Sequence, residues 1–159
     1  RTYRQHTPEI HPFPGVRSLL IKLGQQFRLG LVSDGILKTQ NRKLNALHIS
    51  THFNAVVFSD KWGRSYWKPH TRPFEECARL LGLTPHEIIY VGDNPKKDFH
   101  GARKIGMRTV RVRHPDGLYE KLLPDSAADA PDIEIKSLSS LEEAIKTFGG
   151  PNRNTQGFT

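Results

Sequence analysis

The sequence predicts an α/β fold whose mainly parallel sheet is covered by helices on both faces. Short runs of apolar residues alternate along the chain with segments in which apolar residues recur at the spacing of one helix face. The runs are apolar throughout, which is typical of strands buried on both sides in a parallel sheet. Because ligands bind in such folds beyond the carboxyl ends of the strands, the polar residues directly after the runs are candidates for a functional site.

The first part of the chain is predicted to form two helices and two strands. Apolar residues recur at helical spacing over 16–23, and a glycine follows. Residues 29–32 form an apolar run before Ser33-Asp34-Gly35, which predicts a buried strand and then a tight turn. Residues 36–47 are helical by composition, and 55–58 form a second continuous apolar run, hence a second buried strand.

The middle of the chain continues this alternation after a loop. Residues 59–69 are polar and aromatic without periodicity, which predicts the loop. Pro73 suits the first turn of a helix over 73–81, which a glycine ends. Residues 88–91 are the third apolar run, and 96–105 are predicted to be helical.

The last part of the chain is predicted to add two strands and one helix. Residues 109–112 are a fourth strand candidate. A long connection over 114–131 contains Pro, Asp and Gly and is expected to include a short helical piece at 118–123. Residues 132–135 indicate an edge strand, and the apolar spacing over 138–148 predicts a final amphipathic helix.

Composition favours one globular domain. The chain has 159 residues, of which 36% are hydrophobic and 25% charged. No stretch approaches the ~20 apolar residues that cross a bilayer, and no secretory signal is predicted. The single cysteine, Cys77, can form neither an intrachain disulfide nor a cysteine-based zinc site, and its neighbours suggest a core thiol. A reducing, cytoplasmic location is therefore expected.

The charge balance favours anionic partners. Lys and Arg number 24 against 16 Asp and Glu, a formal net charge of +8. Phosphorylated metabolites, nucleic acids and acidic membranes all fit such a balance. The aromatic loop Trp62–Trp67 could stack on bases, but no long basic run and no RNP, zinc-finger or leucine-zipper pattern is present. Nucleic-acid binding is therefore a minor alternative.

The strongest functional signal is the segment Gly92-Asp93-Asn94-Pro95-Lys96-Lys97-Asp98. Asp93 follows a predicted buried strand, and Asp98 is expected within the first turn or two of the next helix. Two carboxylates that converge at a strand tip offer the hard oxygen ligands that suit Mg²⁺. Taken alone, however, Asp98 could simply favour the positive helix N-terminus, and Asp93 could serve a turn.

Two further positions could complete a phosphate site. Ser33, followed by the backbone N–H groups of Asp34 and Gly35 at a helix start, can hold a phosphoryl oxygen. Lys68, between the second and third predicted strands, can supply a positive charge to the same phosphate. Alone, Ser33 could be a helix N-cap and Lys68 a solvated lysine. Their order and spacing together favour the phosphate site.

These motifs resemble those of the haloacid dehalogenase (HAD) superfamily of phosphohydrolases, and of its phosphoglycolate-phosphatase-like branch. LVSDG with Ser33, YWKPHTRPFEE with Lys68, and YVGDNPKKD with Asp93 and Asp98 match the second, third and fourth family motifs. The resemblance implies a Rossmann-like three-layer αβα fold and hydrolase activity. It also implies that Ser33 binds the phosphoryl group, Lys68 neutralises it and orients the nucleophile, Asp93 holds Mg²⁺, and Asp98 supports the metal site.

The first family motif is missing. No DxD pattern, which supplies the family's aspartyl nucleophile and general acid–base residue, occurs in the chain. Because the chain begins at Arg1 and lacks the family's mobile cap, it is expected to be a C-terminal portion. Residues 1–12 would then be the exit of a cap or linker, 13–148 the core and 149–159 a flexible tail. The core would lack its usual first, central strand, which an upstream segment or another chain would supply.

The expected function is that of a Mg²⁺-dependent phosphohydrolase core acting on a small phosphorylated metabolite. With the nucleophile outside this chain, the chain alone is expected to be inactive. The alternative is a non-catalytic HAD-like binding or regulatory module within a larger protein. An upstream DxDxT would favour the enzyme, a degenerate upstream segment would favour the module, and no membrane partner is expected.

Overall fold

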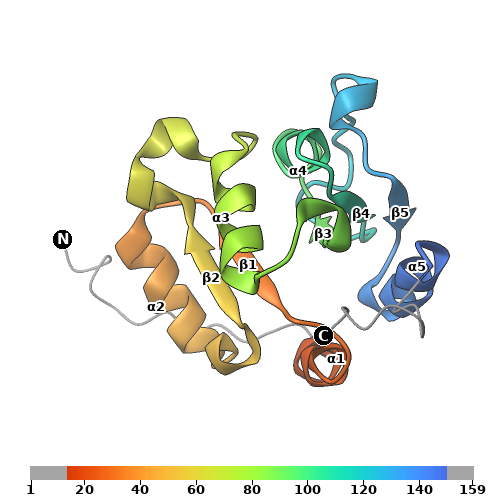
Figure 1. Cartoon of the computed structure of the whole chain (residues 1–159). Helices are drawn as coiled ribbons and strands as arrows, with labels where there is room; N and C mark the ends of the chain where they lie inside the picture. The colour runs from red at the N-terminus through yellow and green to blue at the C-terminus, as the bar shows by residue number, and fades with distance from the viewer. Residues whose placement is uncertain (1–13, 150–159) are drawn as a thin grey trace.

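The computed structural model describes residues 14–149, so the predicted segment 1–12 and the predicted tail beyond 149 lie outside the described residues. Every predicted strand and every main helix is present there, with small shifts in its ends (Figure 1). The helices are α1 (Val16–Gly24), α2 (Leu37–Leu47), α3 (Arg72–Leu81), α4 (His100–Lys104) and α5 (Leu141–Thr147). The strands are β1 (Gly30–Ser33), β2 (Ala55–Phe58), β3 (Ile89–Gly92), β4 (Arg108–Val112) and β5 (Ile133–Ile135).

The strands form two parallel groups rather than one continuous sheet. β1 pairs with β2, and Ser33 lies opposite Phe58. β3 pairs with β4, with Gly92 opposite Arg111, and β4 pairs with the edge strand β5. Between residues 14 and 149, no ladder of hydrogen bonds joins β1 to β3, and the two strands stand on either side of a gap (Figure 1).

Helices α1, α2 and α5 cover one face of the strands. Leu44 of α2 packs with Ile49 and Phe58 against β1 and β2. Leu141 of α5 packs with Val110 of β4 and with β5, and α1 contributes to both clusters. These clusters form because alternate residues of each strand face this side.

Helices α3 and α4 cover the opposite face, which confirms the predicted three-layer αβα arrangement. Cys77 of α3 packs with Val57 of β2 in the core. Phe74 of the same helix packs with Ala102 of α4 and with Met107. Helix α3 therefore contacts both groups of strands and holds them in one body.

An apolar cavity of about 390 Å³ separates the two groups of strands. Its walls include 30–32 of β1, 89–91 of β3, Leu19 and Leu23 of α1, and Cys77. Because β1 and β3 each pair on one side only, their other edges carry backbone groups without a strand partner. The cavity also explains why no residue of α1 is fully buried, although its apolar face points inward.

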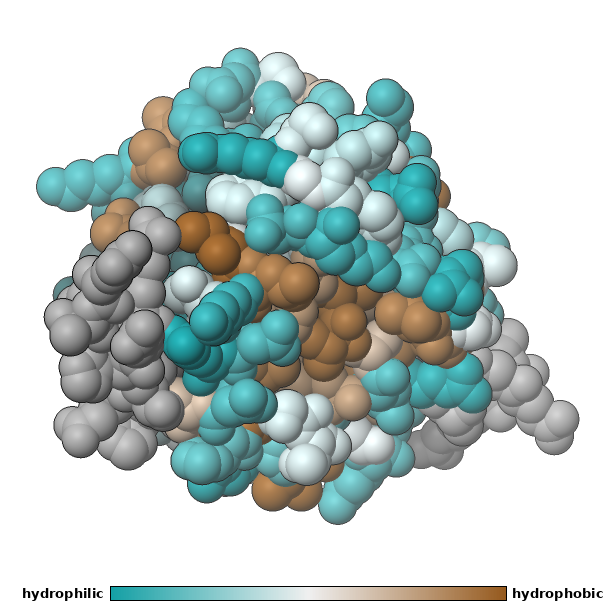
Figure 2. All heavy atoms as spheres, turned by 90° about the vertical axis from the view of Figure 1, so that its left-hand side faces the viewer, coloured by the Kyte–Doolittle hydropathy of each residue, from teal (hydrophilic) through white to brown (hydrophobic). Residues whose placement is uncertain are grey.

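Some apolar side chains of the described residues are exposed at the surface. On the side that carries α2, apolar side chains gather in the middle of the surface, and hydrophilic ones surround them (Figure 2). Ile36 and Leu37, at the start of α2, are exposed by 52% and 38%. No helix within 14–149 is both long and apolar enough to cross a membrane.

Helix α4 begins later than predicted. The sequence predicts a helix from Lys96, but α4 starts at His100. The Asn94 carbonyl accepts hydrogen bonds from the N–H groups of Lys97 and Asp98, at 3.2 and 2.9 Å, and this closes a tight turn first. Asp98 therefore lies in the turn before the helix, and the prediction that it belongs to the first helical turns is wrong.

The prediction of a short helix at 118–123 is also wrong. This segment forms turns, and a short 3₁₀ helix lies later, at Ala127–Asp129. The buried guanidinium of Arg111 donates from Nη2 to the carbonyls of Tyr119 and Leu122, at 2.8 and 2.9 Å. These carbonyls therefore bind a side chain of β4. In the loop predicted at 59–69, the structure adds two 3₁₀ turns, Ser59–Trp62 and Arg64–Tyr66.

Candidate active site

Ser33 ends β1 and presents its hydroxyl at the carboxyl edge of the strands. Its Oγ donates to Oε1 of Gln40, one turn into α2, at 3.1 Å. The residue that precedes α2 as its N-cap is Ile36, so Ser33 is not the helix cap. Gly35 has φ +102, and a Cβ there would collide with the Gln40 amide. A glycine is therefore needed for the turn that joins Ser33 to α2.

Asp34 is a buried carboxylate that ties three segments together. Its Oδ1 accepts from Oγ of Ser59 at 2.5 Å and from the backbone N–H of Lys68 at 3.1 Å. Its Oδ2 forms an ion pair with Nζ of Lys97 at 3.2 Å. Both carboxylate oxygens are thus already engaged by protein partners, so a phosphate contact of Asp34 would fall to its backbone N–H.

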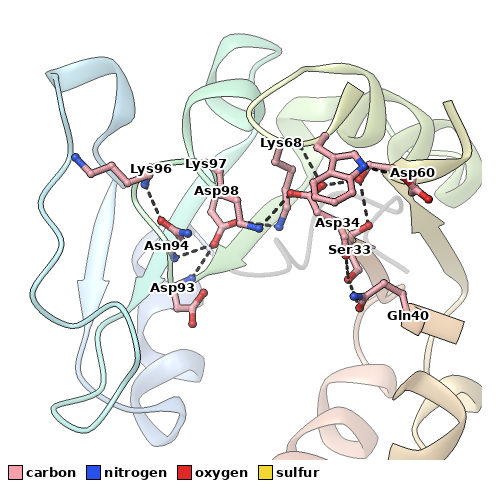
Figure 3. A network of polar contacts seen from close by, with 12 residues as sticks. Ser33, Asp34, Gln40, Asp60, Lys68, Asp93, Asn94, Lys96, Lys97 and Asp98 are labelled. Atoms are coloured by element: carbon pink, nitrogen blue, oxygen red, sulfur yellow. Dashed lines mark hydrogen bonds and ion pairs between the residues drawn. The ribbon is translucent and has the colours of Figure 1, made fainter. Parts of the chain in front are cut away.

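Lys68 is a buried cation, in contrast to the solvated loop lysine of the simpler interpretation. Its side chain is 9% exposed, and Nζ lies 2.7 Å from Oδ1 of Asp98 and 3.0 Å from the hydroxyl of Tyr90 (Figure 3). Burial alone lowers the pKa of Lys68, but Tyr90 and Asp98 outweigh burial and raise it above its ordinary value. Lys68 is therefore charged at neutral pH and can neutralise a phosphoryl oxygen.

Asp98 connects this lysine to the turn after β3. Its second oxygen, Oδ2, accepts from the backbone N–H groups of Asp93 and Asn94, at 3.1 and 2.9 Å. A Cβ on Gly92 would lie 2.7 Å from the same oxygen, so only a glycine allows the carboxylate to approach the backbone this closely. With both oxygens engaged, Asp98 is placed to orient its neighbours.

Asp93 differs from Asp98 because its carboxylate has no hydrogen-bond partner among residues 14–149 (Figure 3). It is exposed at the strand tip. Desolvation by the surrounding protein atoms, and then the negative charge of Asp98, raise the pKa of Asp93. An exposed carboxylate that forms no ion pair within 14–149 is suited to bind a cation.

The described residues offer only part of the ligand set that a magnesium ion would need. Within 14–149, no three His, Cys, Asp or Glu residues gather as a metal-binding group. Mg²⁺ is commonly bound through one or two carboxylates, with water and substrate phosphate completing its octahedron. Asp93 fits such a ligand, and Asp98 fits a supporting residue that fixes the Asp93 backbone. The remaining ligands would come from elsewhere.

The predicted residues lie along one continuous network at the carboxyl edge of the strands (Figure 3). Asp34 follows Ser33 and binds the backbone of Lys68, whose ammonium binds Asp98, which binds the backbone of Asp93. The apolar cavity lies beneath this network, because its lining includes the last strand residues before Ser33 and Gly92 but neither of these two.

Sequence reasoning missed several partners of these residues. Gln40 binds Ser33, Ser59 and Lys97 bind Asp34, and Tyr90 binds Lys68. One of them carried a signal: Tyr90 is a hydroxyl-bearing residue in an otherwise aliphatic run, and a buried tyrosine hydroxyl needs a partner. The others lie in helices or turns where polar residues are common.

The aromatic loop contributes to packing beside the site. Trp62 packs against the cluster that contains Cys77, and the cations of Lys61 and Arg72 lie 4.4 and 5.0 Å from its ring centroid. Nε1 of Trp67 donates to Asp60 at 3.2 Å. Both indoles therefore have protein partners.

The fold and these motifs together define a haloacid dehalogenase-like hydrolase core. Residues 1–112 match the model of that family, and the chain belongs to it. A glyceraldehyde 3-phosphate phosphatase from Methanopyrus kandleri is 38% identical over 86% of this chain and 58% of its own length. A phosphoserine phosphatase from Thermus thermophilus is 34% identical over 74% of the chain and 45% of its own length.

A solved structure confirms the Rossmann-like fold. The 2-haloacid dehalogenase from Pseudomonas syringae superposes with a TM-score of 0.70 at 27% identity, and the match covers 86% of this chain and 54% of that protein. The chain spans about half the length of the relatives it matches.

Proposed function

We propose that this chain is the core of a Mg²⁺-dependent phosphohydrolase that acts on a small phosphorylated metabolite in the cytoplasm. The observation that carries the proposal is the buried Lys68–Asp98 pair, which joins the turn bearing Asp93 to the loops around Ser33. The phosphatases among the relatives support the same reaction class.

Each side chain has a distinct part in this proposal. The Ser33 hydroxyl and the backbone N–H groups after it bind phosphoryl oxygens, and Lys68 neutralises their charge. Asp93 would hold Mg²⁺, and Asp98 orients both Lys68 and the backbone of Asp93. When bound, the metal would stabilise the negative charge that develops on the phosphoryl group.

The nucleophile is proposed to come from an additional strand. Phosphoryl transfer by covalent catalysis needs an activated nucleophile, which the family resemblance implies is an aspartate carboxylate, and the site residues within 14–149 offer none in that role. A strand between β1 and β3 would pair with both open edges, and its carboxyl end would emerge beside Ser33 and Asp93. The apolar walls of the cavity suit a strand buried on both faces. A longer version of this protein, or another chain, would supply it.

The test is Mg²⁺-dependent hydrolysis of p-nitrophenyl phosphate, measured with the chain alone and with a version extended by the upstream coding sequence. We expect turnover only in the extended protein, and loss of turnover in Asp93→Ala. Asp116→Ala, in the exposed connection after β4, is the matched control and should retain activity. Mg²⁺-dependent turnover by the chain alone that Asp93→Ala abolishes would contradict the external nucleophile.

A non-catalytic HAD-like module is the second candidate, because no DxD pattern occurs in this chain. It predicts that the extended protein binds phosphate with Mg²⁺ but does not hydrolyse phosphate esters. The same assay, with binding measured by calorimetry, separates the two.

A further inference from the structure

Tyr90 of β3 carries a hydroxyl that packing alone does not require. Its ring meets Phe74 edge-on, with centroids 4.8 Å apart and an interplanar angle of 89°. A phenylalanine would make the same contact. A buried hydroxyl without a partner destabilises the fold, and among residues 14–149 the hydrogen-bond partner of this hydroxyl is Nζ of Lys68, at 3.0 Å.

The Tyr90 phenol and the Asp98 carboxylate, which both contact the Lys68 ammonium, have different effects on it. Asp98 carries the charge opposite to the ammonium, at 2.7 Å. Burial raises the pKa of Tyr90 to about 12, although Lys68 partly offsets this, so the phenol stays neutral. A neutral phenol oxygen adds no countercharge, but it accepts a second ammonium proton from a different direction. Because an ammonium is tetrahedral, two fixed protons also fix the direction of the third.

We propose that Tyr90 is a positioning residue for Lys68, which together with Asp98 fixes two ammonium protons and reserves the third for the phosphoryl group. The role toward phosphate rests on the proposed function, but the control of the ammonium by Tyr90 does not. β3 is suited to this role because Tyr90 precedes Gly92 by two residues, and its side chain packs on the same side of the strand as α3. The strand that ends at the candidate metal ligand thus also orients the cation.

The test is Tyr90→Phe, which removes the hydroxyl and keeps the ring against Phe74. The readout is the ¹H–¹⁵N signal of the Lys68 ammonium, observable when its protons are held and exchange slowly with water. We expect at least severalfold faster proton exchange in Tyr90→Phe, and phosphate binding in the presence of Mg²⁺ that is roughly tenfold weaker, as for loss of one charge-assisted hydrogen bond. Tyr66→Phe, two residues before Lys68, is the matched control and should change neither.

A second variant separates positioning from packing. Phe74→Leu loosens the contact with the Tyr90 ring but leaves the hydroxyl, so it should lower the melting temperature while the Lys68 signal persists. An unchanged Lys68 signal in Tyr90→Phe, or its loss in Phe74→Leu at a temperature where the fold remains intact, would overturn the assignment. Failure of the wild-type chain to bind phosphate would count against the proposed function alone, because the ammonium signal decides the role of Tyr90 separately.

Discussion

The two ends of the gap between β1 and β3 differ in how their polar groups are satisfied. At the carboxyl edge, hydrogen bonds bridge the two groups of strands. Asp34 accepts from the backbone N–H of Lys68 and from Nζ of Lys97, and the Lys68 ammonium donates to Asp98. Directly beneath, the same two strands face an apolar cavity and have no common hydrogen-bond ladder within 14–149. The polar residues of the candidate site therefore meet at this carboxyl edge, which we call the rim, while the space beneath it, between β1 and β3, is an apolar cavity.

This difference shows what holds the site in place. Helix α3 packs on β1 and β2 through Cys77 and Leu81, and on the β3 side through Phe74 and Ala78. It keeps the strand tips at a fixed separation, and the rim network then bridges them. Single substitutions at the rim should therefore lower the stability of the fold. An added strand should change the accessibility of the cavity.

The largest effect is expected from breaking the rim at Lys68. Lys68→Met leaves the Asp98 carboxylate buried without its cation, which typically costs about 3–5 kcal/mol in the free energy of unfolding. Urea denaturation measures the loss. Lys61→Met, which removes an exposed partner 3.6 Å from Glu76, is the control and should cost less than about 1 kcal/mol. Equal losses of unfolding free energy in the two variants would show that the buried Lys68–Asp98 pair stabilises the fold no more than an exposed ion pair does.

A smaller loss is expected where the rim approaches the backbone of β3. Gly92→Ala places a Cβ 2.7 Å from the Asp98 carboxylate and should lower stability by about 1–3 kcal/mol, as other overpacked sites do. Gly24→Ala, where the new Cβ would meet only Leu29 at 3.8 Å, is the matched control. It should leave the urea midpoint nearly unchanged or raise it. A Gly92→Ala midpoint equal to wild type would mean that Asp98 moves freely.

The cavity can be followed through Cys77, the single cysteine, which lines it. Burial, and then the charge of Glu76, raise the pKa of this thiol to about 11, so its reaction with a disulfide reagent at neutral pH should already be slow. In the upstream-extended protein we expect the reaction to slow severalfold further, because a strand in the gap covers the thiol. A faster or unchanged rate would argue against a strand at this place.

The smallest effect concerns Asp93 and pH. Because its pKa is raised, the folded protein binds this proton more tightly than the unfolded chain does. Protonation therefore stabilises the fold, and Asp93→Asn, which mimics the protonated state, should raise the melting temperature slightly at neutral pH. The gain should vanish as the pH falls toward about 3, through the pKa of the folded state. If the gain in melting temperature grew on acidification, the pKa of Asp93 would be lowered rather than raised in the folded protein.

The sequence predicted most of the fold because its strands are marked by continuous apolar runs and its helices by spacing and glycines. Residues 55–58 match β2 in full, and Gly82 caps the end of α3 directly after Leu81, as predicted. The prediction failed where a tertiary contact decides the backbone. Asn94 closes a turn that delays α4, and Arg111 binds the carbonyls of the segment at 118–123.

From the sequence, the position of the candidate residues at one edge of the strands could be predicted, but their hydrogen-bond partners could not. Ser33, Lys68 and Asp93 follow strands or lie in the loop between them, so their common edge follows from parallel topology. That Asp98 spends both oxygens on Lys68 and the backbone, and that Tyr90 shares the ammonium, depends on side-chain directions in three dimensions. Local spacing does not contain that information.

If the proposed function is correct, the tips of β1 and β3 and the loop of Lys68 share one phosphate and magnesium pocket. The most direct measurement is a titration of the ¹⁵N-labelled chain with inorganic phosphate and Mg²⁺, followed by the amide signals. We expect the signals of Ser33, Gly35 and Lys68 to shift along one binding curve with phosphate, and that of Asp93 to shift with Mg²⁺. Separate curves for these residues, or shifts confined to distant surface lysines, would contradict a shared pocket.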